Sequence, residues 1–348
     1  MKTRFYIFSI LFLSLMSCDK DIERDLNVSV QAFAEGGEMI DGTFVVKKSV
    51  PVTFKINGEP DFITVFNGES GHMYDRRSMT ELPEGAISSK FSCAFYTQYE
   101  NNAENTFRVY LSTFYEGLTK SQAQDKLNLN AEGVWIDISE KCNIPKGRND
   151  KTYNTVGGYS VVEVSLDEYL SSPSLTIAFL YDVTTDAIRP RWEVHDFKIV
   201  ATDIEAGSTS ELTASSIGFS PFYENVSEAD AYKTVTNNAG GFWNLSKISS
   251  SGTQASGSIK YNGMMGIHSR SKNKDEILDR SWLISKPFSL RAYQPDSGEA
   301  IKTITESQDE YTHTYSKVGD YKVSFIFVNE NFQYRQECVK HINIKVTD

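Results

Sequence analysis

The side chains best suited to chemistry in this sequence are its histidines and its many carboxylates, and neither class forms a known catalytic motif. The chain has no H-E-x-x-H, G-x-S-x-G, P-loop or G-x-G-x-x-G pattern. No two of its five histidines have the close spacing of a metal-binding pair. Carboxylate pairs that hydrolyse sugars meet only in the fold, so the 46 acidic residues leave a hydrolase open as an alternative.

One acidic turn has oxygen atoms that could bind a cation. Glu69 and Asp75 lie near the turn around Asn67. Calcium is bound by carboxylate and carbonyl oxygens, so these residues predict a structural calcium site. The alternative is a solvated acidic turn without a bound ion.

Two large aromatic residues lie in a glycine-rich stretch that lacks strand alternation. Phe242 and Trp243 directly follow Gly240 and Gly241, and Tyr223 lies upstream beside Pro221. Sugar rings stack on exposed aromatic faces, so Phe242, Trp243 and Tyr223 are predicted to form a ligand platform. Burial of Trp243 in the core is the alternative, because exposing a tryptophan forgoes about 2 kcal/mol or more of burial.

The chain starts with the features of a secretory signal. A positively charged start precedes an apolar run, residues 5–16, that is too short to span a bilayer. The run ends in Leu-Met-Ser-Cys, which resembles the bacterial lipobox, in which the cysteine carries the lipid. Residues 1–17 are therefore predicted to be a signal peptide and residues 18–26 a tether lipidated at Cys18. The alternative is an ordinary signal peptide followed by a chance cysteine.

The tether is strongly charged. Residues 19–25 read Asp-Lys-Asp-Ile-Glu-Arg-Asp. This cluster resembles the export signal of Bacteroidetes lipoproteins, which implies an outer-membrane protein that faces the cell exterior. A solvated tether without a sorting role is the alternative. The expected membrane contact is the lipid anchor, because several acyl chains hold a protein durably.

Composition sets further limits on function. The formal net charge of −11 argues against nucleic acid as a partner, because phosphate binding needs a basic face. Cys93, Cys142 and Cys338 form no metal-type pair and imply no disulfide framework, although a single bridge stays open. Removing residues 1–17 from the 348 leaves 331, enough for about two domains.

Most of the mature chain alternates in the manner of strands. Apolar residues recur with period two near residues 107–111, 175–179, 321–327 and 342–346. Turn-forming residues separate these runs. Helical patterns are confined to residues 119–127 and 227–236. The predicted class is all-β, with an Ig/PKD-like β-sandwich and a larger jelly-roll sandwich. Trp192 and Trp282 lie in strand motifs and are predicted to be core residues.

The C-terminal part contains a motif that resembles the late hairpin of a PKD domain, an Ig-like sandwich. The pattern H-x-Y-x-x-x-G-x-Y-x-V starts at His313 and ends at Val323. The opening V-x-F strand of such domains occurs instead at residues 52–54. We therefore expect one sandwich made of residues 27–80 and 291–348. Two separate small sandwiches are the alternative.

The middle part, residues 81–290, resembles jelly-roll modules of the cleaved-adhesin type. Residues 282–285 read Trp-Leu-Ile-Ser, as in those modules, although Lys286 stands where the family usually has proline. An apolar strand at residues 177–181 and a W-x-V-x-D-F motif at residues 192–197 match the same pattern. These modules are similar to carbohydrate-binding modules. Most of the chain thus resembles Bacteroidetes surface lipoproteins that join a PKD-like domain to a jelly roll, many of them without an assigned function.

The sequence thus predicts a non-catalytic surface lipoprotein that binds glycan or acts in adhesion through its jelly roll. It predicts no cofactor beyond the calcium at Glu69 and Asp75. One alternative is a jelly-roll glycoside hydrolase. Another is a structural component that contacts partner proteins in an outer-membrane complex.

Overall fold

The computed structural model describes most of the chain. The described residues are 26–98, 102–147, 162–183, 189–237, 239–246, 250–253, 260–268 and 280–348. The predicted signal peptide, Cys18 and the tether as far as Asp25 lie outside them. No helix of this described part is long and apolar enough to cross a membrane.

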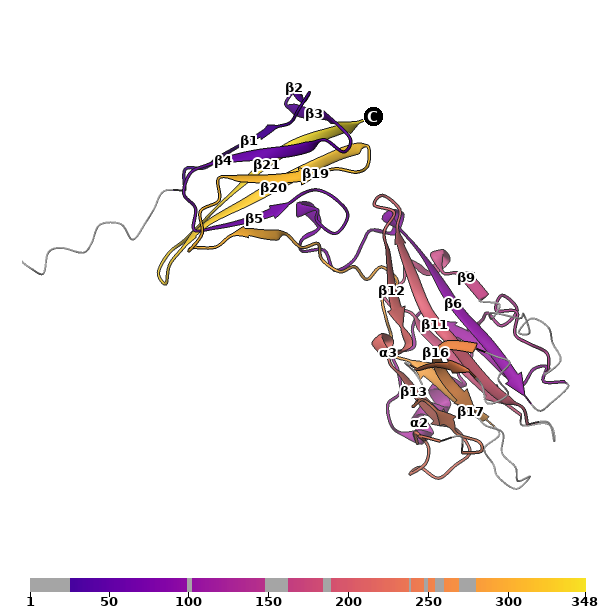
Figure 1. The fold of residues 1–348 in the computed structure, drawn as a ribbon. Coiled ribbons are helices and arrows are strands. Elements are labelled where there is room, and N and C mark those ends of the chain that lie inside the picture. The colour runs from indigo at the N-terminus through magenta and orange to yellow at the C-terminus, as the bar shows by residue number, and fades with distance from the viewer. Residues whose placement is uncertain are drawn as a thin grey trace, which may run out of the picture. The chain divides into compact units, whose positions relative to one another are not determined.

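The chain divides into two compact units (Figure 1). Unit 1 combines the residues up to Thr80 with Gln294–Asp348, and unit 2 is Glu81–Tyr293. Both ends of the chain therefore build one unit, and the second junction falls at Gln294 where the sequence indicated residue 291. Each unit consists of strands in two sheets, so the all-β sandwich prediction is confirmed.

Unit 1 contains a three-stranded and a six-stranded sheet. The smaller sheet has the order β1 (Ser29–Phe33), β4 (Pro51–Asn57), β19 (Glu310–Thr314). The larger sheet has the order β18 (Glu299–Lys302), β5 (Phe62–Phe66), β20 (Gly319–Glu330), β21 (Arg335–Thr347), β3 (Thr43–Lys47), β2 (Glu38–Ile40). β21 and β3 pair in parallel, and the other neighbours are antiparallel. A short 3₁₀ helix, η1 (Tyr74–Arg76), follows β5.

The core of unit 1 lies between these sheets. β4 alternates strictly, and its Val52, Phe54 and Ile56 are buried while the residues between them are exposed or half-buried. Phe54 packs on Phe325 of β20, with ring centroids 5.4 Å apart. Tyr315, from the PKD-like motif, is buried and donates its hydroxyl to the Asn67 carbonyl. The motif therefore connects the C-terminal half of the unit to the N-terminal half.

Unit 2 also contains two antiparallel sheets. The five-stranded sheet has the order β13 (Phe219–Tyr223), β17 (Arg280–Ser285), β10 (Thr176–Asp182), β7 (Phe107–Ser112), β8 (Ile136–Asp137). The seven-stranded sheet has the order β14 (Trp243–Asn244), β16 (Lys260–His268), β11 (Arg191–Asp203), β6 (Ile87–Gln98), β9 (Val162–Ser165), with β12 (Thr209–Thr213) on β11 and β15 (Ser250–Thr253) on β16. Short helical elements connect them: η2 (Glu84–Ala86), α2 (Gln122–Leu129), η3 (Asp167–Tyr169) and α3 (Ala214–Ile217).

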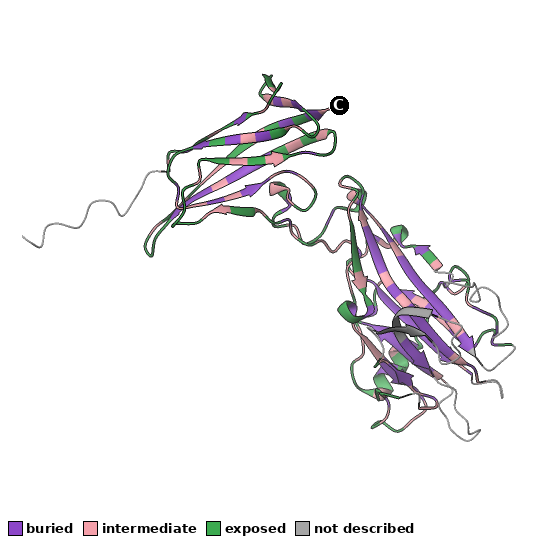
Figure 2. Cartoon of the chain, in the orientation of Figure 1, coloured by how far each residue is buried: buried purple, intermediate pink, exposed green. Residues whose placement is uncertain are grey.

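Aromatic rings fill the space between the two sheets of unit 2. Phe107 of β7 stacks on Trp192 of β11 at 4.8 Å, and Phe179 of β10 meets Phe95 of β6 at 6.2 Å. Buried residues dominate β6 and β11 of the seven-stranded sheet (Figure 2). Residues 176–181 of β10 are buried without alternation, because side chains also cover the far side of the five-stranded sheet. Trp192 and Trp282 are both buried, as the sequence predicted.

The two helical predictions have different outcomes. α2 starts at Gln122, three residues after the predicted start, and ends at Leu129. The prediction of a helix at residues 227–236 is wrong, since that stretch forms turns. There the Ser227 hydroxyl donates to the Asp230 carboxylate, and the Asp230 N–H donates to the Ser227 carbonyl. Such local side-chain bonding favours turns over helix.

Unit 1 should not fold from its N-terminal part alone. Deleting residues 294–348 removes β18, β19, β20 and β21, which leaves β5 without strand neighbours, takes one neighbour each from β3 and β4, and exposes the apolar faces of all three strands. We expect NMR spectra of the truncated chain to lose the dispersed amide signals of residues 27–80, while unit 2 keeps its own unfolding transition. Persistent dispersion from residues 27–80 would contradict the shared sandwich.

Candidate functional site

Two of the three predicted platform residues are part of the core. Trp243 and Tyr223 are each 0% exposed. Trp243 lies in β14, with its indole 5.0 Å from the His268 ring and 6.3 Å from the Phe107 ring. The Tyr223 hydroxyl accepts a hydrogen bond from the backbone N–H of Trp243 at 2.7 Å. Neither side chain has a face for a ligand, so the predicted platform is wrong for both.

The glycine-rich turn before β14 explains this burial. Gly241 has a φ of +79°, a backbone conformation that side chains rarely adopt, and the chain reverses there into β14. The reversal directs Trp243 between the sheets. Phe242, the third predicted residue, is half-buried, and its ring meets the edge of Tyr223 at 5.0 Å. A single half-covered ring does not form a platform.

The two predicted calcium ligands each lie beside a basic side chain. Asp75 is 3.1 Å from the Lys322 ammonium, and Glu69 is 3.2 Å from Nε2 of His313. Across the described residues, no group of three or more His, Cys, Asp and Glu side chains is arranged to hold a metal ion. The structure therefore supplies no cluster in which Glu69 and Asp75 act as joint ligands.

The three cysteines in the described part of the chain are free thiols. Cys93 and Cys142 are buried, and Cys338 is partly covered. Burial raises the pKa of the Cys93 thiol well above its usual value and that of Cys142 to about 12. Both groups stay protonated near neutral pH, and a protonated thiol is a poor nucleophile.

The most distinctive polar arrangement lies on the outer face of unit 2, meaning the side of the five-stranded sheet that is turned away from the seven-stranded sheet. Strand alternation puts Arg108 and Tyr110 of β7 on this face, because Phe107 and Val109 point inward. Residues that pair across neighbouring strands lie on the same face of the sheet. Leu180 of β10 pairs with both Arg108 and Trp282, so these two residues also lie on the outer face.

A second apolar core forms on this outer face, which α2 and the loops around it cover. Its members come from the sheet, from residues 115–129 and from residue 231. They are Tyr115, Leu129, Ala178, Leu180, Phe222, Ala231, Trp282 and Ile284. This second layer explains why the central strands of the sheet are buried on both sides. It also fixes the segment that carries the polar side chains described next.

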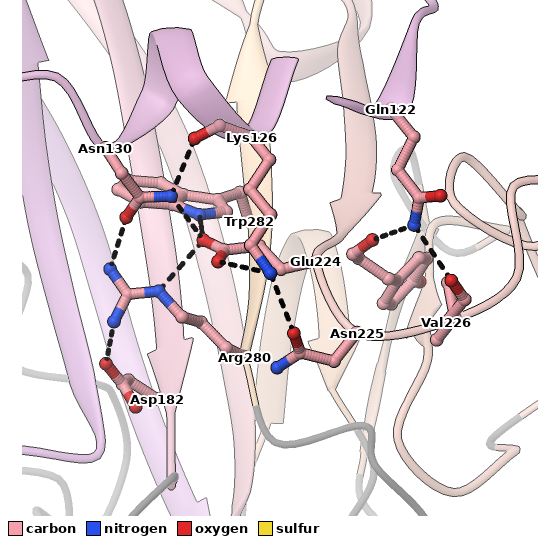
Figure 3. A network of polar contacts seen from close by, with 10 residues as sticks. Gln122, Lys126, Asn130, Asp182, Glu224, Asn225, Val226, Arg280 and Trp282 are labelled. Atoms are coloured by element: carbon pink, nitrogen blue, oxygen red, sulfur yellow. Dashed lines mark hydrogen bonds and ion pairs between the residues drawn. The ribbon is translucent and has the colours of Figure 1, made fainter. Parts of the chain in front are cut away.

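Glu224 is the centre of a buried polar network within this layer (Figure 3). The residue is 7% exposed, and Oε1 of its carboxylate accepts three hydrogen bonds. The donors are Trp282 Nε1 at 2.7 Å, Arg280 Nε at 2.9 Å and Asn130 Nδ2 at 3.0 Å. A buried carboxylate is costly unless its oxygens are bonded, and these bonds meet that need.

Arg280 extends the network to the neighbouring strand. Its other guanidinium nitrogens donate to the carboxylate of Asp182 and, at 2.9 Å, to Oδ1 of Asn130. Lys126 approaches Glu224 at 4.0 Å and donates to Asn225 at 3.0 Å (Figure 3). The network thereby connects the C-terminal end of α2 to three strands of the sheet.

Asp125 fixes the other end of α2. Its buried carboxylate accepts hydrogen bonds from the backbone and hydroxyl of Thr119, both at 2.7 Å, and from the Lys120 N–H at 3.0 Å. The Tyr232 hydroxyl donates to it at 2.6 Å. Burial, and then this contact, raise the pKa of Tyr232. Both ends of α2 are therefore held by a buried carboxylate.

Two half-buried aromatic rings lie at the rim of this layer. The Trp135 indole stacks on Trp282 at 5.6 Å and 25° and donates its N–H to the Leu129 carbonyl. Tyr110 is 6.2 Å from Trp135. The pKa of Tyr110 is raised by burial and by the charge of Asp137, although the guanidinium of Arg108 opposes the shift. Charged groups thus surround the phenol.

A groove of about 760 Å³ adjoins this rim. Arg108 and Asp137, which form an ion pair at 3.1 Å, belong to its wall. The charged lining consists of three acids and three bases: Glu104, Asp137, Glu140, Arg108, Lys141 and Lys146. The groove is therefore polar but balanced in charge. It fits a neutral ligand with many hydroxyl groups better than a strongly charged ligand.

Sequence reasoning did not identify Arg108, Tyr110, Trp135 or Glu224. A signal was present for the first two, because β7 has an arginine and a tyrosine at the positions that alternate with its inward residues. No local signal marked Glu224, whose partner Arg280 lies 56 positions later. Trp135 lies outside the strand motifs, and only the fold brings it next to Trp282.

These features define an all-β protein of two sandwich units with a polar groove on the second unit. A family model described as a domain of unknown function (DUF5017) matches residues 17–219, which is more than half of the chain. The chain belongs to this family. The matched range covers the N-terminal part of unit 1 and unit 2 as far as the start of β13. No curated protein matches the chain significantly.

Removing the carboxylate of Glu224 should strongly destabilise unit 2. Glu224→Ala leaves the Arg280 guanidinium and the Trp282 N–H without their buried acceptor, and breaking such a network costs about 3–5 kcal/mol. Urea unfolding should show this loss. Glu211→Ala is the matched control, because Glu211 is an ion-paired but exposed glutamate of the same unit. A loss below about 0.5 kcal/mol for both variants would contradict the importance of the network.

Proposed function

We propose that this protein is a non-catalytic lipoprotein of the bacterial cell surface that binds glycan through unit 2. The groove whose wall contains Arg108 and Asp137 supports the proposal, together with Tyr110, which lies opposite Asp137 in the β7–β8 pairing, and Trp135, which packs near Tyr110. Aromatic rings stack on the C–H faces of sugars, and paired charged side chains bond their hydroxyl groups. This site replaces the one that the sequence suggested at Phe242 and Trp243.

The main support for this proposal is that the aromatic rings at the rim of the outer apolar layer are held rigidly. Trp135 stacks on Trp282 and donates its indole N–H to the Leu129 carbonyl. Glu224 in turn accepts the indole N–H of Trp282 and so fixes the ring on which Trp135 packs. A ring held in place loses little conformational freedom when a ligand stacks on it, which favours binding. Carbohydrate recognition depends on such prearranged surfaces because each sugar contact is weak.

The carboxylates near the groove favour binding over hydrolysis. In the wall of the groove, Asp137 is ion-paired with Arg108 and Glu104 with Lys146. Both carboxylates already face a basic partner, whereas a glycosidase uses a pair of carboxyl groups that flank the scissile bond. In the proposed function these carboxylates accept hydrogen bonds from sugar hydroxyls.

A second candidate function is contact with a partner protein in an outer-membrane complex. Phe114 and Leu127, beside and within α2, are 70% and 68% exposed. Exposed apolar side chains on one segment are typical of protein contact sites. Binding of glycan by unit 2 would favour the first function, and retention of partner proteins by Phe114 and Leu127 would favour the second.

A glycan array with the protein lacking residues 1–18 tests the glycan proposal. For the best glycan found, Arg108→Gln should raise Kd by about tenfold or more, because losing a hydrogen bond to a charged group costs about 1.5–3 kcal/mol. Lys198→Gln is the matched control, since Lys198 is an ion-paired residue of similar exposure on the other sheet. Equal effects of both variants, or an array without binding, would contradict the proposed site.

The lipid anchor is tested separately. Cys18→Ala removes the thiol that would carry the acyl chains, so the protein should move from the membrane fraction to the soluble fraction. Metabolic labelling with a palmitate analogue should be lost in the same variant. Cys338→Ala is the control, because it removes a partly covered thiol without touching the tether. A Cys18→Ala protein that still sediments with outer membrane would contradict the anchor.

A further inference from the structure

The tip of the β20–β21 hairpin holds an exposed aromatic residue in a fixed turn. Phe332 is 91% exposed, more than any other large apolar side chain in the described part of the chain. The turn is ordered by Asn331, whose Oδ1 accepts the N–H groups of Gln333 and Tyr334, both at 2.9 Å. A single exposed apolar residue is common on protein surfaces, so the inference below depends on where Phe332 lies in unit 1.

The hairpin tip lies at the end of unit 1 where the chain enters from the tether (Figure 1). Leu26, the first described residue, donates its N–H to the side chain of Gln336 at 3.0 Å. Gln336 is the second residue of β21, close to the tip. The carboxylate of Asp61, just before β5, accepts the Glu330 N–H at the same end. Phe332 therefore lies at the same end of unit 1 as Leu26, the residue that the predicted tether precedes.

The length of the tether limits how far this end can move from a lipid at Cys18. Leu26 is eight peptide steps from Cys18, and even fully extended these steps span at most about 29 Å. The opposite end of β20, near Val318, is about 36 Å farther along the strand. The tether therefore holds the end with Phe332 within reach of the bilayer surface.

We propose that Phe332 and Tyr334 dock into the interfacial region of the membrane as a second contact beside the lipid. The inference rests on the lipid anchor of the proposed function and is independent of glycan binding. Aromatic side chains favour this region because their rings are apolar and their edges tolerate polar headgroups. The hairpin tip would orient unit 1 by adding a second point of contact to the lipid anchor.

Charge plays a small part in this contact. Arg335, at the base of the tip, is ion-paired with Glu330 at 3.0 Å and with Glu337 at 3.3 Å. These three residues together carry one net negative charge, so the tip is not drawn to anionic lipid. Docking through Phe332 should therefore depend on apolar insertion, and it should be nearly independent of the anionic lipid content.

The test uses the full lipidated chain in vesicles of phosphatidylethanolamine and phosphatidylglycerol. Phe332→Trp places a fluorescent indole at the tip, and Val318→Trp is the matched control at the other end of β20, where the side chain is 52% exposed. Both positions are open to solvent, so neither change disturbs the fold. Wild-type emission from the four native tryptophans is subtracted. Nitroxide lipids labelled near the headgroup serve as quenchers.

We expect the Phe332→Trp emission to shift to shorter wavelength and to be quenched by the nitroxide lipids, while Val318→Trp keeps its solution spectrum. Equal behaviour of the two variants in protein that floats with the vesicles would overturn the docking inference and leave the anchor intact. Failure to float would overturn both. Quenching restricted to vesicles made from native outer membrane with its proteins would assign the tip to a protein partner and overturn docking to lipid.

Discussion

The pairing of strands from the two ends of the chain is the constraint on which the rest of the structure depends. β5 bonds to β20 and β3 bonds to β21, because buried backbone groups need hydrogen-bond partners. Unit 2 is therefore an insertion between residues 80 and 294, and its own ends must lie together. They do so through the bond from the Leu82 N–H to the Arg291 carbonyl at 3.0 Å.

Unit 2 carries an extra layer on the outside of its sandwich, and this layer needs its own polar contacts. The layer covers the five-stranded sheet and buries Trp282, so the polar groups inside it must be satisfied. Glu224 meets that need with three donors, and Asp125 does the same at the start of α2. Trp135 and Tyr110 stay half-buried at the rim of the layer, and in the proposed function a ligand stacks on them.

The two units therefore suit different tasks in the proposed function. Unit 1 has its tether and its exposed hairpin tip at one end, which suits attachment to a surface. Unit 2 has the polar groove, whose balanced charges suit a neutral, hydroxyl-rich ligand. The family to which the chain belongs has no known function, so the proposed function rests on these side chains and not on analogy with relatives.

The sequence by itself determined the all-β class and the strands with period-two alternation, because alternation and turn residues act locally. It favoured one sandwich made from both chain ends but left two separate sandwiches open, and only the pairing of β5 with β20 and of β3 with β21 decided between them. The sequence determined neither the outer layer nor the site. Residues 227–236 have a helical pattern but form turns. The glycine-rich stretch before Trp243 indicated an open loop, whereas the turn at Gly241 directs Trp243 into the core. Glu224, Arg280 and Trp135 are brought together only by the register of distant strands and the docking of α2. Tertiary structure decided these features, because burial and pairing depend on residues far apart in the chain.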